Sequence, residues 1–306
     1  MDSALQDYIT RSLSLDKLRL IPVGGGSINK TYRLEAGKFV FFCKVNRADQ
    51  FPGMFQKERN GLAFLGSTGT ILVPEVIWFG EDGKNQVLIL EWIEEGFRTS
   101  SFWKKFGEQL AALHRVGVNE IRGSSDGGRP GSSDGDRPTR YGFHEDNYMG
   151  ALPQANNPCD EWVDFFITQR LQPQIQLACD KKMMTSNDVE GFGQLYKKLE
   201  TIFPEEKPSA LHGDLWSGNY LCAQASAPVL IDPAVYYGHR SIDLGMTKLF
   251  GGFDQVFYEA YHYHFPLPQN FDEQVAVCNL YPLLIHLNLF GSGYLSSIRT
   301  ILKRYY

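Results

Sequence analysis

The amino-acid sequence predicts an α+β protein of two lobes, a small antiparallel β-sheet with one helix followed by a larger, mainly helical part. Short stretches with the residue types of β-strands crowd residues 18–93, whereas apolar residues at helical spacing dominate after Gly96. The length of 306 residues also exceeds the usual size of one hydrophobic core. We therefore expect one domain over residues 1–93 and a second over residues 94–306.

Five segments in the first part have the composition of strands, in the order LRLIPV, KTYRLE, KFVFFCKV, VIWFG and QVLILEWI. The turns between them are predicted at Gly24 to Gly26, at Gly37 and at Asp82-Gly83. One helix is expected within residues 52–67, because a proline stands near its start and apolar residues recur at Met54, Phe55, Leu62 and Leu65.

The second part begins with a predicted helix over residues 101–117, whose apolar positions are Phe102, Phe106, Leu110 and Leu113 and whose stop signal is Gly117. The tail over residues 271–306 is also helix-rich. Between them, GSSDGGRP and GSSDGDRP form a tandem octapeptide at residues 123–138, made of turn formers and charges that cannot bury a core. We interpret it as a flexible loop rather than a docking arm.

Composition and charge exclude several classes of partner. The formal net charge is -5 with no dominant basic segment, so nucleic acid is not expected to bind. No run of 18 apolar residues occurs, and the N-terminus lacks a basic segment followed by an apolar one, so neither a membrane span nor a signal peptide is expected. Five scattered cysteines without a CxxC pair fit a reducing compartment, which predicts a cytoplasmic protein.

The segment LHGDLWSGN carries the first candidate chemistry. Asp214 can accept a proton from an alcohol, and Asn219 can reach a metal from the same loop through its amide oxygen. Asp232, at the end of the apolar run VLID, offers the anionic oxygen that Mg²⁺ prefers. Asp214 alone is most simply a turn former, but the three residues together have the spacing of a kinase catalytic loop and its metal aspartate.

A second pair of residues supports phosphoryl transfer. Lys44, within the predicted strand VFFCKV, could bind the α and β phosphates of ATP, and Glu58 on the following helix could pair with its ammonium group. Each residue alone is most simply a solvated surface charge. Together they favour the kinase interpretation, because both residues precede the HGD loop in the order that a kinase requires.

Two further segments are candidates for nucleotide binding. Glycines between two strands allow backbone amides to approach phosphates, although a hairpin turn explains them equally well until Lys44 is considered, and no Walker A ending follows. The lobe connector could offer backbone groups to adenine. The candidate residues are Gly24, Gly25, Gly26 and Ser27 in the loop, and Glu91, Trp92 and Ile93 in the connector.

Four segments, LHGDLWSGN, IDPAVYYGHRSIDLGMTKLFGGF, GFHEDNYMGALPQANN and HLNLFGSGY, closely resemble the fructosamine kinase (ketosamine-3-kinase) family. This family is a branch of the aminoglycoside-phosphotransferase-like kinases, and the resemblance extends from about residue 18 to about residue 294. It implies a protein-kinase-like fold and ATP-dependent phosphorylation of the 3-hydroxyl of a ketosamine, free or on a glycated protein lysine. The phosphorylated adduct then decomposes, so the expected outcome is deglycation.

The resemblance also implies residue roles. Asp214 becomes the base, Asn219 and Asp232 the Mg²⁺ ligands, Lys44 the phosphate lysine and Glu58 its partner. Asp243 is expected to support the catalytic loop, and His212 to orient it by a hydrogen bond.

The acceptor side is less sharply defined. Trp216 could pack against a sugar, although a core tryptophan beneath the loop is about as plausible. His144, Asp146 and Asn147 could line the acceptor pocket, or simply form a packed turn.

One departure from the family bears on assembly. Some members carry a cysteine in the glycine-rich loop that allows redox-controlled pairing of two chains, whereas this chain has Ser27 there. We therefore expect a monomer rather than a dimer. Two alternatives to a ketosamine kinase stay open: a kinase for another sugar or an amino alcohol, and a nucleotide-binding scaffold with little catalysis, which intact Asp214 and Asp232 disfavour.

Overall fold

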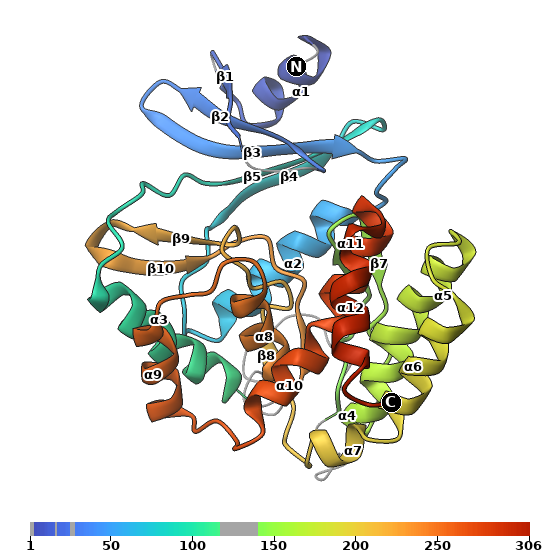
Figure 1. Ribbon diagram of the computed structural model, residues 1–306. Helices are drawn as coiled ribbons and strands as arrows, with labels where there is room; N and C mark the ends of the chain where they lie inside the picture. Colours follow the sequence, from blue (N-terminus) through green and yellow to red (C-terminus); the bar gives the residue numbers. More distant parts are fainter. Residues whose placement is uncertain (1–2, 16, 25–27, 117–139) are drawn as a thin grey trace, which may run out of the picture. The chain divides into compact units, whose positions relative to one another are not determined.

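The computed structural model describes residues 3–15, 17–24, 28–116 and 140–306 (Figure 1). The chain forms two compact units, and the first combines residues 1–102 with residues 218–233. The second contains residues 103–217 and 234–306. The predicted division of the chain at residue 93 did not include residues 218–233 in the first unit. The expected loop at residues 123–138 and the stop signal Gly117 lie outside the described residues.

The first unit is built on a five-stranded antiparallel sheet with the strand order β1-β2-β3-β5-β4. The strands are β1 (Arg19–Pro22), β2 (Lys30–Ala36), β3 (Phe39–Arg47), β4 (Val76–Glu81) and β5 (Asn85–Glu91). All five fall on the segments predicted from the sequence. The turns predicted at Gly37 and Gly83 are also confirmed, because both glycines adopt the left-handed backbone conformation that turns require.

Alternation along the central strand β3 sends its side chains to two different faces. On one face, Cys43 and Val45 join a core with Leu5 and Ile9 of helix α1 (Ser3–Ser12), which the sequence did not predict. On the other face lies Lys44, whose backbone is paired with Thr31 of β2 and Leu88 of β5. The predicted helix is present as α2 (Met54–Ser67).

A hairpin from later in the chain completes the first unit. Strands β9 (Tyr220–Ala223) and β10 (Ala227–Leu230) pair antiparallel, with the 3-10 turn η3 (Gln224–Ser226) between them. The amide of Leu230 donates to the carbonyl of Leu72 at 2.9 Å, and the amide of Gly96 donates to the carbonyl of Cys222 at 2.6 Å. These bonds attach the hairpin to the N-terminal part of the chain.

The second unit is mainly helical. Helix α3 (Ser100–His114), most of which belongs to this unit, buries the four apolar positions predicted for it, all without exposed surface. The other helices are α4 (Trp162–Phe165), the π-helix η2 (Phe166–Leu171), α5 (Gln172–Asp180), α6 (Ser186–Tyr196), α7 (Leu199–Ile202), α8 (Ser241–Leu249), α9 (Gln255–His264), α10 (Phe271–Cys278), α11 (Leu280–Phe290), the 3-10 turn η4 (Ser292–Tyr294) and α12 (Leu295–Leu302). The short strands are β6 (Asn147–Met149), β7 (Leu152–Gln154), β8 (Ser209–Leu211) and β11 (Tyr236–Gly238).

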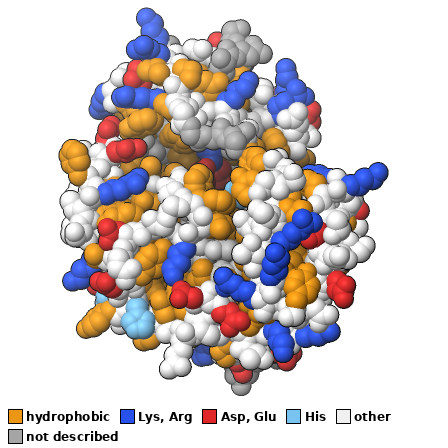
Figure 2. Space-filling model, viewed as in Figure 1, with side chains coloured by type: hydrophobic (Ala, Val, Ile, Leu, Met, Phe, Trp, Pro, Cys, Tyr) orange, Lys and Arg blue, Asp and Glu red, His pale blue; other side chains and the backbone are white. Residues whose placement is uncertain are grey.

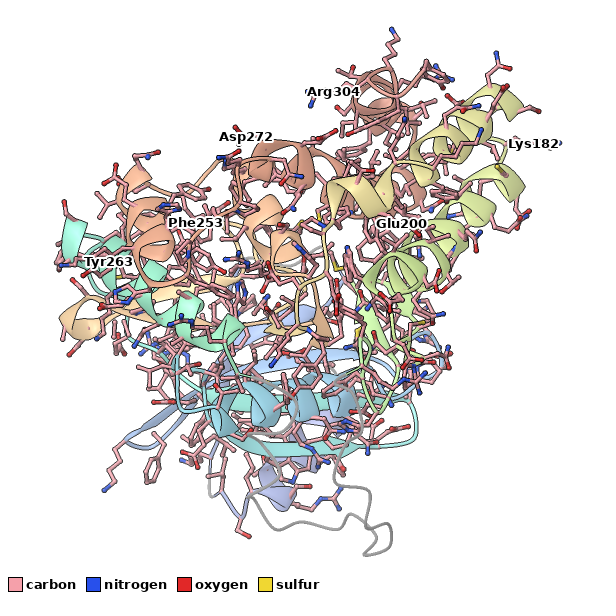
Figure 3. The ribbon with its side chains drawn as sticks, turned by 90° about the horizontal axis from the view of Figure 1, so that it is seen from below. Lys182, Glu200, Phe253, Tyr263, Asp272 and Arg304 are labelled. Atoms are coloured by element: carbon pink, nitrogen blue, oxygen red, sulfur yellow. The ribbon has the colours of Figure 1, made fainter. Side chains whose placement is uncertain are left out.

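Aromatic side chains fill the core of this unit. Phe106 of α3 meets Phe257 of α9 edge to face, with ring centroids 5.3 Å apart, and both side chains are fully buried. Phe253, labelled in Figure 3, is 6% exposed and packs against the same pair, whereas Tyr263 of α9 is 82% exposed. Helix α9 therefore presents one face to the core and the other to solvent.

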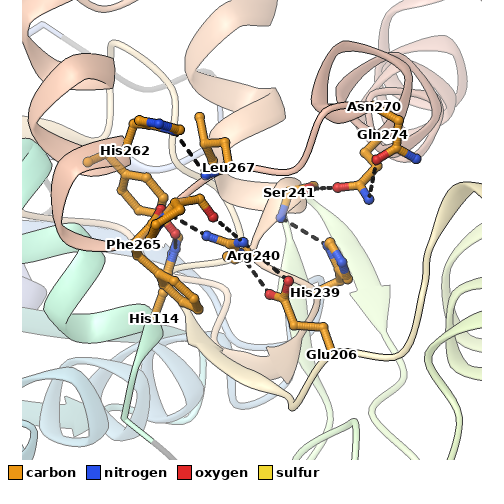
Figure 4. Close-up of polar contacts among 12 residues, drawn as sticks. His114, Glu206, His239, Arg240, Ser241, His262, Phe265, Leu267, Asn270 and Gln274 are labelled. Atoms are coloured by element: carbon orange, nitrogen blue, oxygen red, sulfur yellow. Dashed lines mark hydrogen bonds and ion pairs between the residues drawn. The ribbon is translucent and has the colours of Figure 1, made fainter.

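A buried polar network fixes the start of helix α8 (Figure 4). The Arg240 guanidinium donates to the Glu206 carboxylate at 2.7 and 3.2 Å and to the carbonyls of Phe265 and Pro266. Burial lowers the pKa of the neighbouring His239 to about 3, with a further contribution from Arg240, so this imidazole is neutral in the folded protein. The network positions α8, which carries Asp243.

The surface and the helices give two further observations. Figure 2 shows Lys and Arg side chains interspersed with Asp and Glu over the face drawn there. Among the described residues, no helix combines the length and the apolar character that a bilayer crossing requires.

An ion pair between α6 and α12 gives a prediction for stability in acid. The Asp188 carboxylate caps α6 by accepting from the amide of Thr185 at 2.8 Å, and it binds Arg299 of α12 at 2.6 and 2.9 Å. Hydrogen bonds from Arg299 lower the pKa of Asp188 to about 2. Because this folded-state pKa lies below the unfolded value, the stabilisation is present above pH ~4 and is lost as the pH falls toward ~2.

We expect Asp188→Asn to reduce the free energy of unfolding by about 2 kcal/mol at pH 7. The difference from wild type should shrink steadily as unfolding in urea is repeated at pH values below about 4. Asp272→Asn is the matched control, since this carboxylate is almost fully exposed and pairs with Lys248 only at the surface (Figure 3). An unchanged deficit from pH 7 down to pH 3 in Asp188→Asn would contradict the assigned ion pair.

Candidate active site

Lys44 forms the centre of a three-residue charge cluster in the first unit. Its ammonium donates to both carboxylate oxygens of Glu58 at 2.8 Å and to Oδ1 of Asp232 at 2.9 Å. The Lys44 side chain is 3% exposed, and the Glu58 side chain on the buried face of α2 is 9% exposed. The structure thus brings together three residues that lie far apart in the sequence and that the kinase interpretation had grouped.

The cluster contains one ammonium group and two carboxylates, so its net charge depends on whether the carboxylates are ionised. Burial by itself lowers the pKa of Lys44, but the carboxylates of Asp232 and Glu58 outweigh burial and raise that pKa above its ordinary value. Burial raises the pKa of Glu58 to about 7 in spite of the ammonium, and Asp232 adds to the rise. When both carboxylates are ionised, one ammonium faces two negative charges, so a further cation would stabilise the cluster.

Asn219 and Asp232 lie at the same end of the β9-β10 hairpin. Tyr220 pairs with Leu230, and one step further the amide of Ile231 donates to the carbonyl of Asn219 at 3.1 Å. Asp232 follows immediately, with its side chain 40% exposed. An amide oxygen and a carboxylate are hard oxygen donors of the kind that Mg²⁺ binds, so these two residues fit the predicted metal role.

The backbone at Asp232 is unusual for a residue with a side chain. Its φ of 54° lies in the left-handed region, which aspartate and asparagine tolerate better than most residues. A non-glycine residue in this conformation costs free energy and is often found at functional sites.

A buried aspartate of the second unit anchors the loop that carries Asp214 by hydrogen bonds. Asp243, which has no exposed surface, accepts from the amides of His212 and Gly213, both at 2.8 Å. The amide of Asp214 in turn donates to Nδ1 of His212 at 3.2 Å. The expected supporting roles of Asp243 and His212 are therefore confirmed. Gly213 cannot be replaced without a shift, because a Cβ there would lie 2.0 Å from the carbonyl oxygen of Ala234.

Sequence reasoning missed two residues behind this loop. His114, at the end of α3, lies 3.2 Å from Asp243 through Nε2 and 2.8 Å from the Tyr261 hydroxyl through Nδ1. Because a carboxylate can only accept, Nε2 carries the hydrogen of the bond to Asp243. The sequence did contain one indication that His114 is buried: it follows Leu110 by four positions, which places both residues on the same face of the helix.

Trp216 lies on the same loop and is 37% exposed. Its amide donates to the carbonyl of Asp214 at 3.2 Å, and its ring meets Phe250 edge to face at 6.4 Å. This exposure does not fit the alternative of a tryptophan buried beneath the catalytic loop.

Comparisons with known proteins agree with this geometry. The family described as fructosamine kinase matches residues 4–306. The chain belongs to the fructosamine kinase family. It is 37% identical to a probable ketoamine kinase of Synechocystis over 92% of this chain and 88% of that protein, and 33% identical to the ketosamine-3-kinase of Mus musculus over 92% of each.

Solved structures show the same fold. A putative fructosamine-3-kinase from Thermobifida fusca is 29% identical, with a TM-score of 0.83 over 99% of this chain and 98% of that one. An aminoglycoside phosphotransferase, APH(4)-Ia, is 12% identical with a TM-score of 0.62 over 98% of each chain, a likeness that concerns the fold alone. The predicted α+β, protein-kinase-like fold class is confirmed.

The remaining acceptor candidates of this fructosamine kinase family member lie in the second unit. The side chain of His144 is 73% exposed, and Oδ1 of Asp146 accepts from the amide of Asn156 at 2.8 Å. Asn147 is buried, donates to the carbonyl of Val235 at 2.8 Å and accepts from Gln154 at 2.7 Å. These bonds give Asn147 a packing role, and its contact with an acceptor stays a prediction.

The nucleotide candidates are placed as follows. Gly24 is exposed just after β1, while Gly25, Gly26 and Ser27 lie outside the described residues. The connector follows β5: the Glu91 amide donates to the carbonyl of Glu75, the Trp92 ring lies 5.1 Å from the Arg33 guanidinium carbon, and Ile93 is half-buried. Their contacts with ATP stay predictions.

Proposed function

We propose that this protein transfers the γ-phosphoryl group of ATP to the 3-hydroxyl of ketosamines, the fructosyl or ribulosyl adducts of lysine amines. The observation that carries the proposal is the buried Lys44-Glu58-Asp232 cluster in a chain of the fructosamine kinase family. Two relatives are named for this acceptor class, the mouse ketosamine-3-kinase and a protein-ribulosamine 3-kinase of Arabidopsis thaliana that is 35% identical over 92% of this chain and 81% of that protein.

The residues of the first unit bind the nucleotide in this mechanism. Lys44 donates to the α and β phosphates, and Glu58 keeps its ammonium in place by the two hydrogen bonds already present. Asn219 and Asp232 would hold Mg²⁺, which neutralises phosphate charge when it is bound.

The residues of the second unit bind and activate the acceptor. Asp214 accepts the proton of the acceptor hydroxyl as the bond from oxygen to the γ-phosphorus forms and the bond to the β-phosphate oxygen breaks. Asp243 keeps Asp214 in position through the amides of His212 and Gly213. The face of Trp216 packs against the sugar. The product carries the phosphate next to the ketoamine and decomposes with release of the amine, so the reaction serves deglycation. We further expect a cytoplasmic monomer.

Acceptor profiling with mass detection tests this function. We expect ADP to form only when a fructosyl- or ribulosyl-lysine derivative is added with ATP and Mg²⁺, and the product to gain one phosphoryl group before it releases free lysine. The Asp214→Asn protein is the blank that corrects for contaminating kinases. If an aminoglycoside, a free sugar or an amino alcohol were phosphorylated and no ketosamine reacted, the proposed acceptor would be wrong. The protein would then be a kinase for another small molecule.

A further inference from the structure

A row of aromatic side chains extends from the catalytic loop to the end of helix α11. The rings of Trp216 and Phe250 are 6.4 Å apart, and those of Phe250 and His286 are 4.5 Å apart. His286 also meets Phe290 at 5.4 Å and Tyr294 at 5.1 Å. We call these five residues the aromatic row. Because Trp216 stands two positions after Asp214, the row begins beside the proposed base.

The aromatic row is not part of the buried core. Trp216 and Phe290 are 37% and 55% exposed, and the other three residues of the row are half-buried. By contrast, the ring of Phe257, in the core of the same unit, has no exposed surface. Several large rings that adjoin one another and stay partly open to solvent form a surface suited to a ligand.

His286 adds a defined hydrogen-bond acceptor to this surface. Its Nδ1 lies 2.7 Å from the carbonyl oxygen of Pro282. A carbonyl oxygen can only accept, so Nδ1 carries the hydrogen, and burial lowers the pKa of His286, which keeps the ring neutral. The lone pair therefore sits on Nε2, for which the described residues provide no hydrogen-bond donor.

We propose that the aromatic row is the subsite for the protonated secondary amine of the ketosamine, with Nε2 of His286 accepting one of its hydrogens. This inference rests on the proposed function and specifies how the acceptor is selected. In a ketosamine the amine is attached to the first carbon and the reacting hydroxyl to the third, so both groups fall within one short segment of the ligand. A cation near ring faces gains cation–π attraction, and a neutral imidazole can accept from it without repulsion.

The proposal predicts selectivity for the charged amine over a neutral linkage. The test compares a fructosyl-lysine derivative with its ether analogue, in which oxygen replaces the amine nitrogen and the sugar is unchanged. We expect His286→Phe to raise KM for the amine acceptor by about tenfold or more, since a hydrogen bond to a charged group is lost. The KM values for the ether analogue and for ATP should stay as in wild type.

Phe290→Ala provides a second variant, at an exposed position where folding is not threatened. Loss of one exposed cation–π contact should raise KM for the amine acceptor by about two- to fivefold, again without an effect on the ether analogue. Tyr263→Ala is the matched control, since Tyr263 is an exposed aromatic residue on α9, outside the row, and should change neither KM value.

The outcomes separate this inference from the proposed function. If wild type phosphorylates ketosamines but the variants weaken amine and ether acceptors equally, the row does not recognise the amine and the inference is overturned. If Phe290→Ala lowers the preference for the amine even where His286→Phe fails to fold, the inference stands. If wild type phosphorylates no ketosamine, the proposed function fails first, and the inference falls with it.

Discussion

Replacement of Asp214 by asparagine is expected to reduce kcat by about 10² to 10⁴, the usual contribution of a general base. Asparagine keeps the size of the side chain but cannot take up the hydroxyl proton. The amides of His212 and Gly213 that bind Asp243 are not altered by this replacement, so the loop should keep its position. The affinity for ATP, measured by titration without acceptor, should therefore stay close to that of wild type.

Asp272→Asn removes an exposed carboxylate elsewhere in the second unit and should leave kcat unchanged. If Asp214→Asn weakened ATP binding while kcat with saturating substrates stayed high, the proton would have to go to another group. The proposed base would then be wrong, although the family assignment would not be affected.

Replacement of Lys44 by methionine is expected to impair both catalysis and stability. Loss of the ammonium removes the proposed ligand for the α and β phosphates, so the KM for ATP should rise and kcat should fall. It also leaves the buried carboxylate of Glu58 without its partner, which should cost about 3 kcal/mol of unfolding free energy. Beside the ammonium the pKa of Glu58 is about 7, and removal of the ammonium raises this pKa further. The deficit relative to wild type should therefore grow as the pH rises above about 7, because protonated Glu58 needs no partner.

The double variant Lys44→Met/Glu58→Gln separates the two effects. Neutral glutamine removes the unpaired charge, so urea unfolding should show most of the lost stability restored. Turnover should stay low, because no cation returns to the phosphates. Recovery of turnover together with stability would show that Lys44 has only a structural role.

The elements of the first unit were predictable because their signals are local. Strand β3 combines β-branched and aromatic residues, and the glycines that adopt left-handed conformations mark its turns. The pair Lys44 and Glu58 was also predictable, since a strand followed by a helix brings residues 14 positions apart into contact. The supporting role of Asp243 was predicted only from the resemblance to the family, because no local pattern in the sequence indicates it.

Contacts over long sequence separations escaped prediction. His114 and Tyr261 are 147 positions apart, and nothing near either residue indicates that they share a hydrogen bond. Helix α1 has only ten residues, so its amphipathic pattern is short, and its partners in the sheet follow later in the chain. The aromatic row likewise combines residues from the catalytic loop, the end of α8, α11 and η4. The family strings contain all five residues, but only Trp216 was predicted to contact the acceptor.

The hairpin β9-β10 has a consequence for how this protein can be divided. A fragment that ends at residue 102 would retain the sheet and α2 but would lack the two strands that bond to Leu72 and Gly96, together with Asn219 and Asp232. The first unit is thus encoded in two pieces separated by more than one hundred residues. Exchange of this unit between relatives by recombination therefore requires both pieces to be inherited together. A single crossover would combine the proposed phosphate lysine of one relative with the proposed metal ligands of the other.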